Sequence, residues 1–451
     1  MNRLWMTAGP VLRTGAKRLV LLLILALTVT FASAADWPQW RGPDRSGVSK
    51  ETGLLQKWPE KGPRLAWTFR NAGFGFSSFA IVKDTLYTLG TRDKDEIVIA
   101  LNANDGQELW TAKIGPIFTF KGNTWGDGPR STPTVDGNLL FALGGQGELV
   151  CLDVTQKGME VWRKNLISDF KGEMMSEWGY AESPLIDGDR LICTPGGPDG
   201  TLAALDKKSG IVQWRSTGLK QKAPYTSATV AEIHHLRQYI QMSAAADKND
   251  GFVSGFAADN GKVLWSTPLF KGYVYSIASS PPIVVGATVF VTCLSETTTN
   301  CHAFALDPAF KVTDLYSKKN QNSLKNNHGG VVLVGDCIYG YSERTGWVCQ
   351  DFKTGKVLWN ERDALEGGGS IISAEGRLYL YSDQGEVVLL EANPKEWTEI
   401  SRFAIPATSK LRKAADTSKS AGIWAHPAIA NGRLFLRDDE LIFCYDIRGA
   451  K

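Results

Sequence analysis

A glycine followed four residues later by a tryptophan recurs along this chain and constrains its fold more than any other feature. In the clearest copy, residues 100–110, an apolar run is followed by a glycine turn and by a second run that ends on an indole. The five full copies are Gly106/Trp110, Gly158/Trp162, Gly210/Trp214, Gly261/Trp265 and Gly355/Trp359. Three weaker copies carry Trp67, Tyr316 and Phe403 at the corresponding position. Repeats at a similar long spacing are typical of a solenoid, a propeller or an array.

Each repeat predicts four short strands. In residues 131–164 we expect strands at 131–135, 138–143, 148–153 and 159–163, with Asp136-Gly137 as the turn of the first hairpin. The pairs Asp187-Gly188, Glu375-Gly376 and Asn431-Gly432 stand at the same place in other repeats. Helical periodicity is absent, so each repeat is predicted to fold as an antiparallel meander.

A single meander leaves apolar surface exposed, so neighbouring sheets must stack, and stacking around an axis gives a propeller. We expect an all-β, eight-bladed propeller with blades that begin near residues 78, 130, 181, 225, 279, 328, 369 and 424. The last repeat supplies three strands, and residues 64–69 form a fourth strand without a blade, so the two are predicted to pair and close the ring. Large flat side chains are predicted to fill the wedges between blades: Trp67, Trp110, Trp162, Trp214, Trp265 and Trp359.

The first 34 residues have the pattern of a secretory signal peptide. Basic residues precede an apolar run at 19–31, and the small residues Ala32-Ser33-Ala34 follow it as a cleavage site. An uncleaved anchor is disfavoured because the run is shorter than the roughly 20 residues of a membrane-spanning helix. We therefore expect cleavage after Ala34, a periplasmic or secreted protein, an arm at 35–63 and a propeller at 64–451.

Charge and cysteine content narrow the possible partners. Fifty basic and 47 acidic residues leave a net charge of +3, which offers no electrostatic basis for nucleic-acid binding. Seven cysteines in an exported chain make disulfides possible and leave at least one thiol free. Either Cys293/Cys301 or Cys337/Cys349 could bridge adjacent strands, and the pairing stays open. We expect a monomer.

The unit Ala204-Leu205-Asp206 with Gly210 and Trp214 resembles the repeat of the pyrroloquinoline-quinone-like (PQQ-like) β-propellers. The resemblance covers nearly all of the chain after the signal peptide. The opening Trp37-Pro38-Gln39-Trp40-Arg41-Gly42-Pro43 is similar to that of exported propellers of this superfamily. The resemblance to this superfamily implies the fold more than the function, because the superfamily includes quinone-dependent alcohol dehydrogenases and non-catalytic BamB-like outer-membrane assembly factors.

The resemblance also implies which features each of these two groups should carry. Quinoprotein dehydrogenases hold their cofactor between an indole and a disulfide of adjacent cysteines, with calcium and a catalytic aspartate, and this sequence has no adjacent cysteine pair. No Cys-x-x-Cys-His motif for covalent haem occurs either. No cofactor is therefore predicted, although PQQ and calcium stay possible. BamB-like factors carry a lipidated N-terminal cysteine, which is missing here, so no stable membrane anchor is expected.

The candidate site lies in the segments that lead into each first strand, because in a propeller they approach the central funnel. These lead-in segments include Tyr273-Val274-Tyr275 and supply an arginine for anionic groups, a glutamate, two histidines as base or metal ligand, and aromatic rings. A purely structural role, holding the centre of the ring together, is the competing interpretation. No His-x-His spacing occurs, and no metal site is predicted. The candidate ligand-binding residues are Arg130, Trp178, Tyr180, Glu182, Tyr225, Asn327, His328, Trp424 and His426.

The sequence favours an exported propeller that works by binding, as a scaffold or a ligand-recognition module without redox chemistry of its own. The partner would be a protein, a small molecule or a glycan at the central funnel. The alternative is a quinone- or metal-dependent oxidoreductase that acts on an alcohol or a sugar at the funnel.

Overall fold

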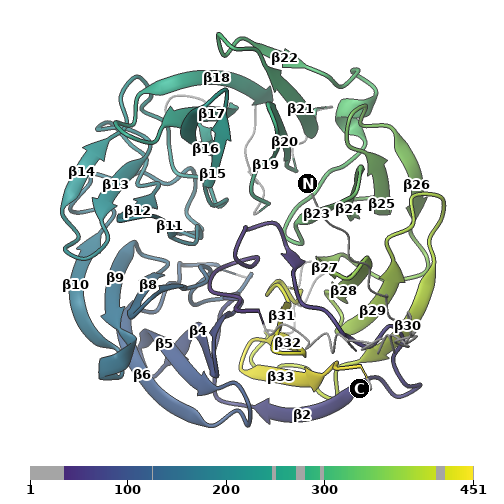
Figure 1. Ribbon diagram of the computed structural model, residues 1–451. Coiled ribbons are helices and arrows are strands. Elements are labelled where there is room, and N and C mark those ends of the chain that lie inside the picture. The colour runs from purple at the N-terminus through teal and green to yellow at the C-terminus, as the bar shows by residue number, and fades with distance from the viewer. Residues whose placement is uncertain are drawn as a thin grey trace, which may run out of the picture. The chain divides into compact units, whose positions relative to one another are not determined.

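Each predicted repeat folds into one antiparallel sheet of four strands, and eight such sheets stand around a common axis as the blades of a propeller (Figure 1). The computed structural model describes residues 35–123, 125–245, 250–270, 280–294, 299–412 and 422–449. The prediction of a signal peptide at 1–34 therefore lies outside the described residues. The predicted fold class, an all-β propeller with eight blades, is confirmed.

Blades 1 to 4 follow one another along the chain, each running from an inner first strand to an outer fourth strand. Blade 1 contains β3 (Ala80–Val82), β4 (Thr85–Arg92), β5 (Asp95–Asn102) and β6 (Glu108–Pro116). Blade 2 contains β7 (Thr134–Asp136), β8 (Leu139–Leu143), β9 (Glu148–Asp153) and β10 (Met159–Asn165), with the 3₁₀ turn η1 (Val154–Gln156) before its last strand. Blade 3 contains β11 (Leu185–Asp187), β12 (Arg190–Cys193), β13 (Ala203–Asp206) and β14 (Val212–Arg215). Blade 4 contains β15 (Thr229–Ile233), β16 (Leu236–Ala244), β17 (Gly251–Ala257) and β18 (Val263–Phe270).

Blades 5 to 8 continue the ring. Blade 5 contains β19 (Ile283–Val285), β20 (Thr288–Thr292), β21 (Cys301–Leu306) and β22 (Val312–Asp314), followed by η2 (Asn320–Asn322). Blade 6 contains β23 (Val331–Val334), β24 (Cys337–Ser342), β25 (Gly346–Asp351) and β26 (Val357–Glu361). Blade 7 contains β27 (Gly369–Ala374), β28 (Arg377–Ser382), β29 (Glu386–Glu391) and β30 (Glu399–Ala404). Blade 8 contains β31 (Ala428–Ala430), β32 (Arg433–Asp438), β33 (Leu441–Asp446) and, from the start of the chain, β2 (Arg64–Phe69).

The strand from the start of the chain closes the ring, as predicted. β2 pairs antiparallel with β33, with Trp67 opposite Cys444. This pairing completes blade 8 with a segment that precedes blade 1, so the two ends of the repeat region are joined in one sheet. Blade 8 therefore has four strands like the other blades, and β2 is its outer strand.

Two of the predicted hairpin turns are shifted by one residue. Asp136 pairs with Leu139, so the loop residues are Gly137 and Asn138 rather than Asp136 and Gly137, and the turn after Asp187 is shifted in the same way. Gly137 has a φ of +59°, which suits glycine at the first loop position of a type II′ turn. The turns at Glu375-Gly376 and Asn431-Gly432 lie where they were predicted.

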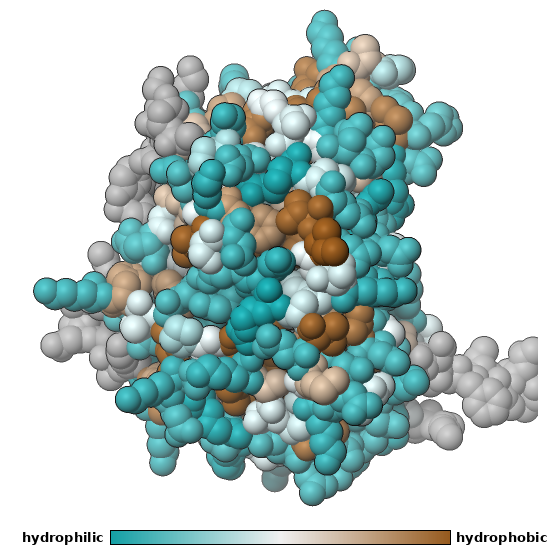
Figure 2. Space-filling view, turned by 90° about the vertical axis from the view of Figure 1, so that its left-hand side faces the viewer, coloured by the Kyte–Doolittle hydropathy of each residue, from teal (hydrophilic) through white to brown (hydrophobic). Residues whose placement is uncertain are grey.

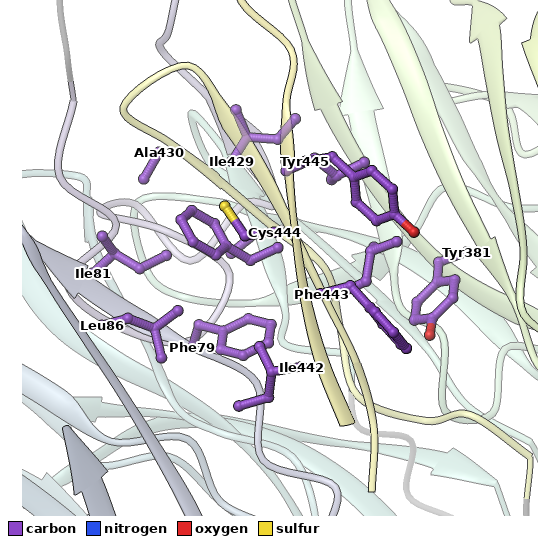
Figure 3. Close-up of a cluster of buried hydrophobic side chains, with 14 of the residues drawn as sticks. Phe79, Ile81, Leu86, Tyr381, Ile429, Ala430, Ile442, Phe443, Cys444 and Tyr445 are labelled. Atoms are coloured by element: carbon purple, nitrogen blue, oxygen red, sulfur yellow. The ribbon is translucent and has the colours of Figure 1, made fainter. Parts of the chain in front are cut away.

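The core consists of apolar layers between neighbouring blades. Figure 3 shows the layers on either side of β33, where Ile442 and Cys444 point toward one neighbouring blade, and Phe443 and Tyr445 point toward the other, which carries Tyr381. Because side chains alternate along a strand, one buried strand contributes to two layers. This double burial explains why the middle strands are almost continuously apolar.

The repeat tryptophan packs on the repeat glycine of the following blade. A Cβ atom on Gly210 would lie 2.8 Å from the ring of Trp162, and the indole Nε1 of Trp162 donates to the carbonyl of Lys207 at 3.0 Å. Trp67 has the same relation to Gly106. The recurring glycine and the recurring tryptophan of the repeat therefore meet in one contact between adjacent blades.

Other repeat aromatics keep the contact with the glycine or the hydrogen bond to the following blade. Trp110 packs on Gly158 and Trp214 on Gly261. The weaker copy Tyr316 uses its hydroxyl in place of an indole N–H. Three of these side chains donate to a carbonyl of the following blade: Trp67 to Ala103 (3.0 Å), Tyr316 to Phe352 (2.7 Å) and Trp359 to Asn393 (2.8 Å). Trp265 instead donates within its own blade to Gln238 (2.7 Å).

The arm that precedes β2 occupies the middle of the ring (Figure 1). Trp37 exchanges backbone hydrogen bonds of 2.8 and 2.7 Å with Ile81 on the inner strand of blade 1. The short strand β1 (Val48–Ser49) then pairs parallel with the inner strand β27 of blade 7. The chain between these two contacts forms a loop inside the ring, so the axis is filled by protein.

Two buried arginines anchor the tip of this loop. Arg41 donates to the carbonyls of Ser46, at 3.1 Å, and Val331, and burial lowers its pKa to about 10. Arg45 reaches the opposite side of the ring, and burial lowers its pKa to about 9. Both remain cationic at neutral pH. The acceptors of Arg45 are Gln39 Oε1 (2.8 Å) and the carbonyls of Ser183 (3.0 Å), Ala228 (3.3 Å) and Pro184.

The side of the ring that faces the viewer in Figure 2 is largely hydrophilic, with small separate apolar patches. Outer strands β10 and β14 lie on the side that faces the viewer and expose Met159 and Val212. Exposed apolar side chains scattered in this way are ordinary on protein surfaces. The described part of the chain contains no helix with the length and hydropathy that a membrane crossing requires. All seven cysteines are buried free thiols, so neither pair left open by the sequence is bridged.

Candidate functional site

The lead-in segments of six blades bring half-buried rings into one chain of contacts, with an arginine among them. We call this set the mouth cluster, and it consists of Phe76, Trp125, Arg130, Trp178, Tyr225, His328 and Trp424.

Trp424, in the segment before blade 8, is the centre of the mouth cluster. The His328 ring stacks on its indole at a centroid distance of 4.0 Å and an interplanar angle of 17°. Phe76 lies 4.9 Å away and Trp125 5.9 Å away. One indole thus joins lead-in segments of blades 8, 6, 1 and 2, which are far apart in the sequence.

The ring contacts continue to blades 3 and 4. Trp125 meets Trp178 edge-on at 6.4 Å, and Trp178 stacks on Tyr225 at 6.0 Å. The Tyr225 hydroxyl is in turn hydrogen-bonded to Ser176. Each ring keeps part of its surface accessible. The result is an extended aromatic surface with polar edges, suited to contact with another molecule.

Arg130 gives this surface a fixed positive charge. Its guanidinium lies 4.3 Å from the Phe118 ring centroid and 5.6 Å from that of Phe76, and donates to the carbonyls of Gly128 (2.6 Å) and Gly126 (3.0 Å). Burial lowers the pKa of Arg130 to about 10, so it stays cationic at neutral pH.

His328 is neutral in this setting. Burial and then the charge of Arg130 lower its pKa to about 4. A neutral imidazole can accept or donate a hydrogen bond, but it does not serve as a cation at physiological pH.

Carboxylates from blades 6, 7 and 8 lie beside the cluster and were missed at the sequence level. Asp383 packs against Gly422, two residues before Trp424. Burial, and to a lesser extent the negative charge of Glu343, raises the pKa of Asp383 to about 7. Burial raises the pKa of Asp439 to about 6, and Asp439 lies 3.5 Å from the amide of Gly75, next to Phe76. All three carboxylates come from turns between second and third strands, which carry no motif of their own.

Three of the nine candidate residues lie inside the protein with partners of their own. The buried carboxylate of Glu182 accepts from the amide and, at 2.7 Å, the hydroxyl of Thr194, and burial raises its pKa to about 7. Tyr180 is buried and donates to the carbonyl of Pro195 at 2.9 Å. Here the structure favours the role of holding the ring together.

His426 is the third, and it connects the mouth cluster to the arm. Its Nε2 lies 2.9 Å from the carbonyl oxygen of His328, and its Nδ1 lies 3.4 Å from Nη1 of Arg41. The edge of the Trp40 ring meets its ring at 5.6 Å. Burial and the Arg41 charge lower its pKa to about 3. His426 therefore links the tip of the arm to His328, whose ring stacks on Trp424.

Five of the nine candidates thus share one surface: Arg130, Trp178, Tyr225, His328 and Trp424. The ninth, Asn327, bonds to the Glu343 carboxylate at its edge. Phe76 was missed because the lead-in of blade 1 was left out, although the rule used for the other blades would have found it. The predicted lead-in residues Tyr273 and Tyr275 lie outside the described residues.

Two cavities lie away from the mouth cluster. One, of about 440 Å³, is lined by Pro38 and Gln39 of the arm together with Asp136 and Lys207. The other, of about 430 Å³, lies at β18 and β21 beside the bonded pair His302 and Asp314. Neither is lined by a mouth-cluster residue. Among the described residues, no group of three or more histidine, cysteine or acidic side chains is arranged to hold a metal ion.

Solved structures with a similar fold include a BamB protein, an alcohol dehydrogenase and a designed protein. BamB from Moraxella catarrhalis matches with a TM-score of 0.56 and 15% identity over 85% of this chain and 99% of its own. Quinohemoprotein alcohol dehydrogenase from Comamonas testosteroni matches with a TM-score of 0.56 and 12% identity over 92% and 81%. The computationally designed Ika8 protein matches with a TM-score of 0.54 and 9% identity over 85% and 100%. Likeness at these identities shows the fold alone.

Sequence comparison adds the family. No curated protein matches the chain significantly. A family model described as "Outer membrane protein assembly factor BamB" matches residues 94–361, which is more than half of the chain. These residues run from the turn between the second and third strands of blade 1 to the end of blade 6, so the match covers the repeats themselves. The chain belongs to this BamB-like family of PQQ-like β-propellers.

Proposed function

We propose that this protein is an exported scaffold that binds a protein partner through the mouth cluster and has no redox chemistry of its own. The observation that carries the proposal is the continuous run of half-buried rings around Trp424, with Arg130 among them. Trp, Tyr and Arg are the residue types that dominate binding energy at protein interfaces.

The charges beside the rings favour a peptide chain as the partner. Arg130 can pair with an acidic side chain or a carbonyl, and the carboxylates of Asp383 and Asp439 can accept from amide or basic groups. A surface with both signs and flat apolar rings complements a polypeptide, which carries donors, acceptors and apolar groups together. The family description, an outer membrane protein assembly factor, agrees with a protein partner.

The packing at the axis supports binding rather than quinone chemistry. A planar quinone would need a slot between flat surfaces, yet Trp424 already stacks on His328 at 4.0 Å, and the arm inside the ring buries Arg41 and Arg45. The described side chains thus do not fit a PQQ site as they are placed, and we derive no reaction step through that cofactor.

Site-specific crosslinking tests the binding surface. A photoreactive amino acid at Trp178 should crosslink a discrete protein in intact cells, whereas the same group at Met159, which is 58% exposed on the rim, should not. The Trp424→Ala substitution should reduce the Trp178 crosslink at least about tenfold, because loss of a central interface aromatic costs about 2 kcal/mol or more. Equal crosslinking from both positions would remove the basis for the proposal.

Export and chemistry need separate measurements. Cell fractionation should place the protein outside the cytoplasm, and retention inside would contradict the export part. Purified protein mixed with PQQ and calcium should show no alcohol-dependent dye reduction. Dye reduction at a stoichiometric cofactor level would instead support the oxidoreductase alternative.

A further inference from the structure

We propose that cleavage after Ala34 creates an α-ammonium group on Ala35 that forms an ion pair with the buried Glu51 and locks the junction between blades 8 and 1. The inference goes beyond partner binding, because it concerns how the mature chain is held closed. It rests on the export proposal only for the cleavage itself.

The main-chain nitrogen of Ala35 already donates a hydrogen bond to the Glu51 carboxylate. Ala35 N is 2.9 Å from Glu51 Oε1. Glu51 is only 3% exposed, and its carboxylate also accepts from the amide of Asn431 at 2.5 Å and the amide of Gly432 at 2.6 Å. Its three described hydrogen bonds all come from main-chain nitrogens, and none of them carries a charge before cleavage.

Cleavage would convert one of these donors into a cation. Hydrolysis by a signal peptidase adds water across the peptide bond between Ala34 and Ala35. The C–N bond breaks, the water oxygen joins the carbonyl carbon of Ala34 as a carboxylate, and the Ala35 nitrogen takes up the protons to become an ammonium group. A buried carboxylate without a charged partner is unfavourable, and a charge-assisted bond is stronger than a neutral one.

The surrounding contacts show what the pair would lock. Asp36 Oδ1 accepts from the amide of Lys83 at 2.8 Å, in the first hairpin of blade 1. The side chain of Asn431, in the first hairpin of blade 8, donates to the carbonyl of Lys83 at 2.7 Å. Ala35, Glu51 and these two hairpins therefore form one network where the first and last blades of the ring meet.

The reactivity of the amine tests the pair directly. The exported protein should begin at Ala35 by intact mass. At pH 7.5, acylation of its α-amine should be at least about tenfold slower than in a Glu51→Gln variant, because the pair holds the half-buried amine in its protonated form. A rate unchanged by Glu51→Gln would overturn the ion pair, and a different N-terminus would overturn the cleavage site.

A matched control separates the pair from loss of any arm anchor. Glu375 also holds the arm through two main-chain amides, those of Gly53 and Leu54, at 2.8 Å each. Glu375→Gln should leave the acylation rate at the wild-type value.

A second variant keeps the test informative if Glu51→Gln folds poorly. A Gly-Ser extension before Ala35 moves the ammonium away and should expose it to acylation, while an equally slow rate would contradict the proposal. None of these outcomes depends on the mouth cluster, so failure here is distinguishable from failure of partner binding.

Discussion

Replacing Gly210 by alanine should destabilise the propeller through a contact between two blades. Gly210 has a φ of +69°, and a Cβ atom there would lie 2.8 and 2.9 Å from two atoms of the Trp162 ring. The indole cannot retreat freely, because Trp162 is buried and its Nε1 is bonded to Lys207. The substitution therefore combines backbone strain with overpacking.

The two contributions can be separated with Gly188→Ala. Gly188 has a similar φ of +59°, but nothing lies within 4 Å of its added Cβ. A left-handed residue other than glycine costs about 1–2 kcal/mol, and overpacking a filled site adds about 1–3 kcal/mol. We expect a loss of about 1–2 kcal/mol for Gly188→Ala and about 2–5 kcal/mol for Gly210→Ala.

Urea denaturation followed by far-UV circular dichroism measures the difference. Both variants should unfold with the wild-type slope and at lower midpoints, with the lower midpoint for Gly210→Ala. Adding Trp162→Leu should make Gly210→Ala less damaging, since the smaller side chain leaves room, and the two changes should be non-additive. If both glycine variants shift the midpoint equally, the packing of tryptophan on glycine does not stabilise the ring.

Three further outcomes are expected. Burial raises the pKa of Glu96 to about 7 from an unfolded value near 4.5, so the folded state binds the proton more tightly and the free energy of unfolding should fall as pH rises from about 4.5 to 7. Glu96→Gln should remove up to about 3 kcal/mol of that fall, and an unchanged stability–pH curve would contradict the shift. Tyr316→Phe removes the only described donor to the Phe352 carbonyl and should cost about 1–2 kcal/mol in the same urea assay, whereas a neutral effect would show that water replaces the hydroxyl. Because all seven thiols are buried and free, a thiol reagent should label none in the native protein and seven after denaturation without reductant, and a smaller final count would reveal disulfides.

The fold was accessible from the sequence because the repeat is a local pattern with one physical meaning. Strand alternation and glycine turns define each meander, and a glycine followed four residues later by a tryptophan, as at Gly210/Trp214, recurs at a long spacing typical of repeat folds. Even ring closure could be predicted, since residues 64–69 have strand character and lack a blade of their own.

The candidate site was only partly accessible. The lead-in rule brought Trp178, His328 and Trp424 to one surface, as the structure has them. It gave no means to see that Glu182 and His426 turn inward, because side-chain direction in an irregular segment follows no period.

What the sequence determined, then, is most of what depends on neighbours along the chain: the strands, the number of blades and the residue types of the segments that lead into the blades. The tertiary structure alone decided which of those residues share a surface, that Arg41 and Arg45 fill the axis, and that Ala35 lies on Glu51. These contacts join segments separated by up to several hundred residues or by an irregular loop. No repeat or periodicity encodes them, because they are selected by how the closed ring packs.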